Sequence, residues 1–443
     1  MRDIVLGLGM LFYLPLSIIS PAAGLMCWEW FSIMNPHRQV YGLLHAKPLN
    51  SAIAVATVLG WLLSQERKRF TPDLLPWLLL LWFFWMTLGT LAAPVPVVAW
   101  DYWDRVMRIL VPVFFCFALL TTKARLVGMA WVLVIALGYY GIKGAGYLMI
   151  GGSGTIVGPP SSMIADNNTL AAAVVMELPL VYFLWKHTRL RLLRIGLAAA
   201  IPLQVMMVFG SHSRGGVIAL GVVLFLLWLR SDRKILYALF GMAMAVLVIQ
   251  TMPDKIWARL ATMHSVQSIQ DDSSFHGRLM AWKVAILCAR DYFPFGAGFY
   301  TPQMHAIFNH YLPEEDAHAA HSIYCQVLGE HGYIGLAIYL VILVLPLLNA
   351  TLVIHRTRGV AEMAWAHDLA DMIRVALIAF YVGGAALSLA YFDGYLVLIA
   401  MTSCLREMTA PRRRGAAAEA KSPARPPGEL VGVGPGAAVR PRL

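Results

Sequence analysis

Long apolar blocks separated by short polar segments make up most of this chain. Many blocks approach or exceed the roughly 20 residues with which a helix crosses the apolar core of a bilayer, at about 1.5 Å of rise per residue. Twelve blocks are interpreted as transmembrane helices, at residues 3–20, 49–64, 73–92, 99–120, 124–141, 163–185, 190–209, 215–229, 233–250, 320–350, 370–389 and 392–406. The pattern predicts an all-α polytopic membrane protein with about twelve transmembrane helices.

The polar segments between these blocks differ in length. Residues 251–320 form the longest polar interval, and we expect them to form a large external loop that contains helices. Residues 22–48 are rich in tryptophan and too broken for a span, which is typical of an interfacial segment. The predicted organisation is nine transmembrane helices in 1–250, the loop in 251–320, three transmembrane helices in 321–409 and a disordered cytoplasmic tail in 410–443.

Composition and charge agree with this topology. Hydrophobic residues make up 59% of the chain and charged residues 13%, whereas soluble domains carry roughly 25% charged residues. The net charge of +11 comes largely from short basic loops, at 65–70, 121–125, 186–194, 230–234, 355–359 and 405–415. If one of these loops is cytoplasmic, alternation of the spans places all of them there, as the positive-inside rule expects. The charge therefore indicates orientation and does not indicate a nucleic-acid partner.

Arg214 is the first candidate for chemistry. It lies in the short turn SHSRGG, at the outer boundary between two predicted spans. An arginine there runs against the positive-inside bias, so an anionic partner is expected. The flanking Gly215 and Gly216 allow backbone and ligand to approach closely. A long side chain that reaches a lipid phosphate is the alternative.

Arg278 is the second candidate, in the sequence SSFHGRLMAW. Ser273 or Ser274 precedes an apolar-periodic stretch, which predicts a helix capped at one of these serines. Arg278 would then lie near the positive end of the helix, where a cation is favourable only if an anion binds beside it. A salt bridge with Asp271 or Asp272 is the alternative.

Two histidines at the start of the span at 320–350 are candidates for a general base. His318 and His321 would share one helical face if that helix begins before Ala317. An imidazole is partly neutral at pH 7 and can accept a proton. The chain lacks an HExxH motif and an obvious third ligand, so no metal is predicted. Glu330 either orients His321 or faces water.

Further basic residues lie near the predicted outer boundary. Arg105 and Arg108 share a helical face, and Asp101 or Asp104 would neutralise them. Lys143 lies at the start of the external loop at 141–162. Structural roles and contacts with an anionic substrate remain open for Arg105 and Lys143.

Three motifs, taken in order, resemble the O-antigen ligase and O-antigen polymerase superfamily of bacterial inner-membrane glycosyltransferases. They are the Arg-Gly-Gly turn at 214–216, Arg-x-x-x-Trp at 278–282, and a His-Ser pair at 321–322 that leads through GEHGYIG into a span. The N-terminal third, especially residues 1–38, is similar to the branch of exosortase-associated O-glycosylation ligases.

The resemblance implies a donor glycan on undecaprenyl pyrophosphate, transferred en bloc to a hydroxyl of lipid A–core on the periplasmic side of the inner membrane. It implies neither a metal nor another cofactor. Arg214 and Arg278 match the two arginines of the family, and His321 matches its essential histidine. Single-step displacement with inversion is expected, with His318, Arg105 and Lys143 as further substrate contacts. Transfer to protein, glycan polymerisation and, as a different class, transport of lipid-linked glycans remain alternatives.

Overall fold

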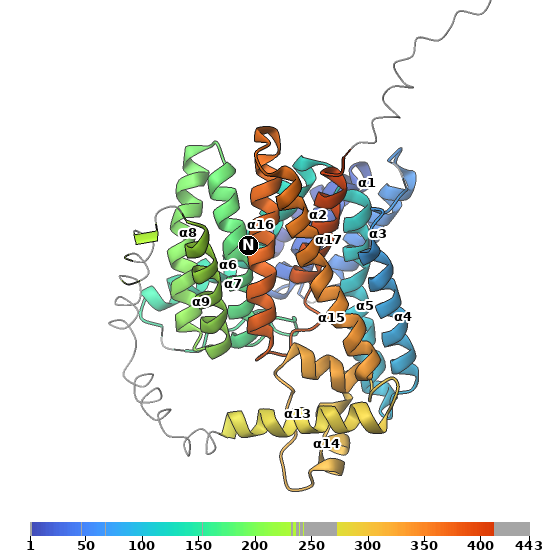
Figure 1. Cartoon of the computed structure of the whole chain (residues 1–443). Coiled ribbons are helices and arrows are strands. Elements are labelled where there is room, and N and C mark those ends of the chain that lie inside the picture. The colour runs from blue at the N-terminus through green and yellow to red at the C-terminus, as the bar shows by residue number, and fades with distance from the viewer. Residues whose placement is uncertain are drawn as a thin grey trace, which may run out of the picture. The chain divides into compact units, whose positions relative to one another are not determined.

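The computed structural model describes residues 2–231 and 273–411 apart from 46, 67 and 153, and in between it describes 234, 235, 239 and 242. The described residues form helices linked by short connections (Figure 1). The long helices are α1 (Arg2–Ile19), α2 (Pro21–Met34), α3 (Leu49–Leu63), α4 (Leu74–Leu91), α5 (Pro96–Leu119), α6 (Lys123–Met149), α7 (Asn167–His187), α8 (Arg191–Gly210), α9 (Arg214–Arg230), α13 (Ser273–Asp291), α15 (Ile323–Thr357), α16 (Ala364–Gly384) and α17 (Asp393–Met408). The shorter elements are η1 (Pro36–Arg38), η3 (Thr301–Gln303), α14 (His305–Tyr311) and η4 (Ala361–Met363).

Most predicted spans coincide with a helix to within a few residues. Six helices in the described ranges are long and apolar enough to cross a membrane by length and composition, namely α1, α4, α6, α7, α8 and α15. The span expected at 233–250 and the loop residues 251–272 fall largely or wholly outside the described residues. The helical membrane fold is thus supported, while the count of twelve spans and the large periplasmic loop stay predictions.

The segment at 22–48 differs from its expected character. Its first part is the helix α2, which packs against α1, α3, α5 and α6. The rings of Trp28 and Phe31 are buried among protein side chains, not spread along a surface. Gly24 lets α2 and α3 approach closely, since a Cβ there would lie 2.5 Å from Thr57 Oγ1. A helix of 14 residues is too short to show as a span in the apolar pattern, which explains why it was missed.

The core lies around α7, α16 and α17. All residues of α17 from Asp393 to Leu405 are buried, and α7 is buried from Thr169 to Val181. A helix that is buried on every side is surrounded by other parts of the protein, whereas an apolar helix at the rim of a membrane protein can face lipid. Accordingly, α17 packs on α5, α15 and α16, and α7 packs on α6, α8, α9 and α16.

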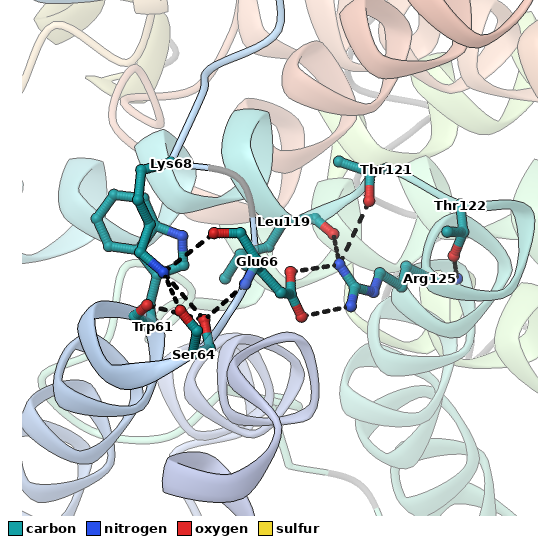
Figure 2. Close-up of polar contacts among 8 residues, drawn as sticks. All are labelled: Trp61, Ser64, Glu66, Lys68, Leu119, Thr121, Thr122 and Arg125. Carbon is teal, nitrogen blue, oxygen red and sulfur yellow. Dashed lines mark hydrogen bonds and ion pairs between the residues drawn. The ribbon is translucent and has the colours of Figure 1, made fainter. Parts of the chain in front are cut away.

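The basic loops are joined to one another by ion pairs. Figure 2 shows Arg125, at the start of α6, donating two hydrogen bonds of 2.6 and 2.9 Å to Glu66 in the connection between α3 and α4. The same guanidinium donates to the carbonyl of Leu119 at 2.9 Å. Asp73, which caps α4, pairs at 2.7 Å with Arg406 near the end of α17. The connection between α3 and α4 thus contacts both the start of α6 and the end of α17, while the cytoplasmic location of the basic loops stays a prediction.

Candidate functional site

The helix that follows His321 is broken one third of the way along. α15 is interrupted at Gly332, whose φ of 70° and ψ of −175° fall in a region that only glycine adopts readily. A Cβ at Gly332 would lie 2.5 Å from the carbonyl oxygen of Pro294 and 3.0 Å from the nitrogen of Gly296. The single span expected at 320–350 is therefore two helical segments, because the backbone at 294–296 passes directly against the break.

The break releases backbone carbonyls, which find new donors. The bonds run from the Ala297 N–H to the Gly329 carbonyl (2.9 Å), from the Gly298 N–H to the Glu330 carbonyl (2.9 Å), and from Trp85 Nε1 to the His331 carbonyl (2.9 Å). Buried carbonyls need such partners, so these contacts stabilise the break. The first segment, 323–331, packs on α13, since a Cβ at Gly329 would lie 3.1 Å from the Cβ of Ala285.

The side chain of Glu330 is bonded to residues around this break. Its side chain is buried and accepts hydrogen bonds from the Tyr300 N–H at 3.1 Å and from the Tyr391 hydroxyl. The same Tyr391 oxygen lies 2.8 Å from His331 Nε2. The prediction that Glu330 orients His321 or faces water is therefore wrong, because its carboxylate oxygens are used to hold Tyr300 and Tyr391 in place.

His321 lies in an irregular loop directly before α15. The helix begins at Ile323, and Ser322 caps it by accepting a hydrogen bond from the Cys325 N–H at 3.4 Å. His321 has a φ of 44°, in the left-handed region that side chains with a Cβ rarely adopt. The shared helical face predicted for His318 and His321 is therefore not formed, since that backbone cannot continue a right-handed helix.

The surroundings of His321 favour its neutral form. Burial lowers the pKa of the imidazole below its usual range, and the charge of Arg278 and the neighbouring His318 lower it further. The carboxylate of Asp166, at the N-terminal end of α7, acts in the opposite direction. His321, Arg278 and His318 are thus close enough for their charges to interact. A neutral imidazole at pH 7 is the state that a general base requires.

α13 brings Arg278 to this loop. A helix over 273–291 agrees with the prediction, while Asp271 and Asp272 lie outside the described residues. Trp282, one turn after Arg278, donates from Nε1 to the Ala320 carbonyl at 2.7 Å. The ring of His318, in the same loop, packs on α13 at Gly277. Figure 1 shows α13 lying across the end of the helices at which α15 begins.

Arg214 is the first residue of α9 and is exposed. Ser213 caps the helix by accepting a hydrogen bond from the Gly216 N–H at 3.0 Å. A Cβ at Gly216 would lie 2.7 Å from the Cβ of Ala171 on α7, so glycine is needed for this close approach. The start of α9 is thus fixed against α7.

The connection between α16 and α17, residues 385–392, adjoins both Arg214 and His321. A Cβ at Gly215 would lie 3.6 Å from the Cβ of Ala386. Two residues later, Ser388 Oγ accepts a hydrogen bond from the His321 N–H at 2.8 Å. Segments that are far apart in the sequence therefore share one neighbour, and the structure brings the turn of Arg214, the helix of Arg278 and the loop of His321 to the same end of the molecule.

Arg105 and Lys143 have partners of their own. Arg105 donates to the Ser161 carbonyl at 2.9 Å and lies over the ring of Tyr102. Lys143 lies over the ring of Tyr139, with 5.7 Å between Nζ and the ring centroid. These contacts hold the local structure, and a role for either residue in substrate binding stays a prediction.

Asp104 pairs with Arg108, which leaves Arg105 to the loop carbonyl of Ser161. Cys288 and Cys325 are both free thiols. In the part of the chain that the structure describes, no group of three or more His, Cys, Asp or Glu side chains is placed to hold a metal ion.

Sequence reasoning missed the loop 294–298 and Ser388. Gly296 and Gly298 both have positive φ, at 74° and 83°. Two glycines separated by one residue, placed between Arg278 and His321 in the sequence, were the available signal for a close backbone approach. Ser388 offered no comparable signal, because its partner lies 67 residues away.

The architecture indicates a class, namely a multi-pass α-helical membrane protein, in which the turn of Arg214, the helix of Arg278 and the loop of His321 lie at one end of the helices. The family model described as O-Antigen ligase matches residues 197–340. This match supports an assignment to the O-antigen ligase and polymerase superfamily, and the matched range includes Arg214, Arg278 and His321. A family of unknown function (DUF5935) matches residues 1–189. No curated protein matches the chain.

Proposed function

We propose that this protein is an inverting glycosyltransferase of the bacterial inner membrane. It moves a glycan en bloc from undecaprenyl pyrophosphate to a hydroxyl group of lipid A–core, on the periplasmic face and without a metal ion. The superfamily supports a lipid-linked glycan and an acceptor as the general partners. The choice of lipid A–core as acceptor follows the ligase branch of that superfamily.

One observation carries this proposal. The loop of His321 is held beside the helix that carries Arg278, and burial together with the charge of Arg278 lowers the pKa of the imidazole. Such an imidazole can take a proton from a hydroxyl group at pH 7. A guanidinium beside it suits a pyrophosphate, because arginine binds phosphate oxygens through two parallel hydrogen bonds.

In the proposed reaction, His321 takes the proton of the acceptor hydroxyl while the oxygen attacks the anomeric carbon of the donor glycan. The bond between this carbon and the pyrophosphate oxygen breaks, and its electron pair leaves with undecaprenyl pyrophosphate. Arg278 and Arg214 neutralise the charge that develops on the leaving group. A single displacement inverts the configuration at the anomeric carbon, and a pyrophosphate leaves without an acid catalyst.

One observation favours a candidate of a different class. A transporter of lipid-linked glycans would carry ionisable residues within its spans, and Glu177 is buried in the middle of α7. A transporter moves the donor and leaves its glycosidic bond intact. If the protein is such a transporter, Glu177→Gln would abolish movement of the donor across the membrane of a vesicle. If it is a transferase, the Glu177→Gln variant would keep its rate of glycan transfer.

The test uses the purified full chain in nanodiscs, with a synthetic undecaprenyl-pyrophosphate glycan and, separately, lipid A–core, an acceptor protein or a second lipid-linked glycan. We expect a glycosylated lipid A–core, inverted at the new linkage, and free undecaprenyl pyrophosphate. A product on the protein or on the second glycan would show that the acceptor differs from lipid A–core, while the proposed transfer chemistry would still hold. Intact donor with every acceptor would contradict the proposed function.

A further inference from the structure

The peptide group between Ala320 and His321 is hydrogen-bonded at both of its ends. Its carbonyl accepts from Trp282 Nε1 at 2.7 Å, and its N–H donates to Ser388 Oγ at 2.8 Å. The two side chains come from different elements, since Trp282 belongs to α13 and Ser388 to the connection between α16 and α17. Two elements distant in sequence therefore fix the plane of a single peptide group.

This peptide is the one whose rotation would relax His321. The φ of His321 is 44°, which is unfavourable for a residue with a Cβ. Rotating the plane between residues 320 and 321 changes this φ, and it turns both the carbonyl and the N–H away from Trp282 and Ser388. The surroundings must hold such a conformation, and these two hydrogen bonds act on the peptide itself.

We propose that Trp282 and Ser388 are positioning residues, which clamp the peptide between Ala320 and His321 and thereby aim the His321 imidazole at the acceptor hydroxyl. The inference rests on the proposed function. Neither residue touches the reacting atoms. Their contribution is to keep the base in a backbone conformation that it would otherwise leave.

The clamp also relates His321 to both arginines. Trp282 follows Arg278 by four residues, so the two side chains lie on the same side of α13. The indole bond thus sets the distance between the loop of His321 and Arg278. On the other side, Ser388 follows Ala386, which packs on the start of α9. Moving either anchor would change the alignment of the base with a phosphate-binding cation.

Kinetics of substituted proteins test the clamp. For Ser388→Ala and for Trp282→Phe, we expect kcat to fall by about 10- to 100-fold, the loss that misplacement of a reacting group by about 1 Å produces. KM for the donor should change little, and Ser388→Thr, which keeps the hydroxyl, should restore kcat. The double variant should lose less than the product of the two single losses, because both bonds hold one peptide.

A matched variant separates the clamp from a general loss of packing. Trp103 Nε1 on α5 donates to Thr87 Oγ1 on α4 at 3.0 Å. Trp103→Phe removes an indole hydrogen bond of the same kind and should keep kcat. The thermal unfolding midpoint of each variant shows whether it folds, and Ser388→Ala, which removes the other hydrogen bond of the same peptide, carries the test if Trp282→Phe does not fold.

A second measurement needs no glycan transfer. Diethyl pyrocarbonate modifies neutral imidazoles, and mass spectrometry of the peptide that contains His321 gives the pH midpoint of its modification. In Ser388→Ala this midpoint should rise towards that of a free imidazole, and in Ser388→Thr it should stay. If the midpoint shifts in Ser388→Ala but the protein without substitutions transfers no glycan, the clamp would be supported and the proposed function would be refuted. Multiplicative losses in the double variant, or an unchanged midpoint and kcat in Ser388→Ala, would overturn the clamp.

Discussion

Gly332→Ala tests whether the break in α15 positions the site. A Cβ at this residue would lie 2.5 Å from the Pro294 carbonyl oxygen, in a backbone conformation with φ of 70°. Keeping the break then costs about 1–3 kcal/mol in backbone strain before the clash is counted. Straightening the helix instead gives up the three hydrogen bonds that hold the break, each contributing roughly 0.5–1.5 kcal/mol. Either route destabilises the fold by about 2–4 kcal/mol.

The assay compares thermal unfolding and glycan transfer of Gly332→Ala with those of Gly146→Ala. Gly146 lies inside α6, and an added Cβ there meets nothing within 4 Å. Alanine at that position should leave stability unchanged or raise it by up to about 1 kcal/mol. Gly332→Ala should lower the unfolding midpoint and also kcat, because the segment 323–331 sets where His321 lies. Equal stability and equal activity of the two variants would refute the role assigned to the break.

Three further predictions concern the site itself. Arg278→Lys should lower kcat by about 10-fold or more, because lysine cannot make the paired phosphate contacts of arginine; a near-normal rate would show that Arg278 does not bind phosphate in this way. The transfer rate should fall as the pH falls through the lowered pKa of His321, with a midpoint below that of a free imidazole, and Arg278→Gln should raise this midpoint; a pH profile with its midpoint unchanged by Arg278→Gln would contradict the electrostatic account. EDTA should leave transfer unchanged, and loss of activity that zinc restores would return a metal to the mechanism.

The apolar pattern predicted most helices because it is a property of each segment by itself. α8 begins and ends within one residue of its predicted span at 190–209, and α9 does so for the span at 215–229. The pattern failed where packing against neighbouring helices determines whether a segment forms a helix. α2 is short and is stabilised by burial against α1 and α3, so no apolar run of membrane length marks it.

For the candidate site, the sequence likewise predicted the residues but did not predict their arrangement. Motifs and side-chain chemistry made Arg214, Arg278 and His321 candidates for the site, and their roles stay predictions. Their arrangement was not predicted, since the break at Gly332 depends on donors from residues 297 and 298 and from Trp85. The hydrogen bond of Ser388 to the His321 backbone likewise joins residues with no relation in the sequence. Helix periodicity therefore suggested a shared face for His318 and His321 that the loop does not have.

The central claim is that one imidazole, that of His321, takes the proton of the acceptor. It is tested most directly by measuring a single turnover of the purified chain with saturating donor and lipid A–core, for His321→Ala and for the control His305→Ala. His305 is exposed on α14, where its Nδ1 lies 3.3 Å from Asn309 Oδ1. The account predicts that His321→Ala lowers the rate by about 10²–10⁴-fold, as expected for loss of a general base, while His305→Ala keeps it. Full transfer by His321→Ala would contradict the account.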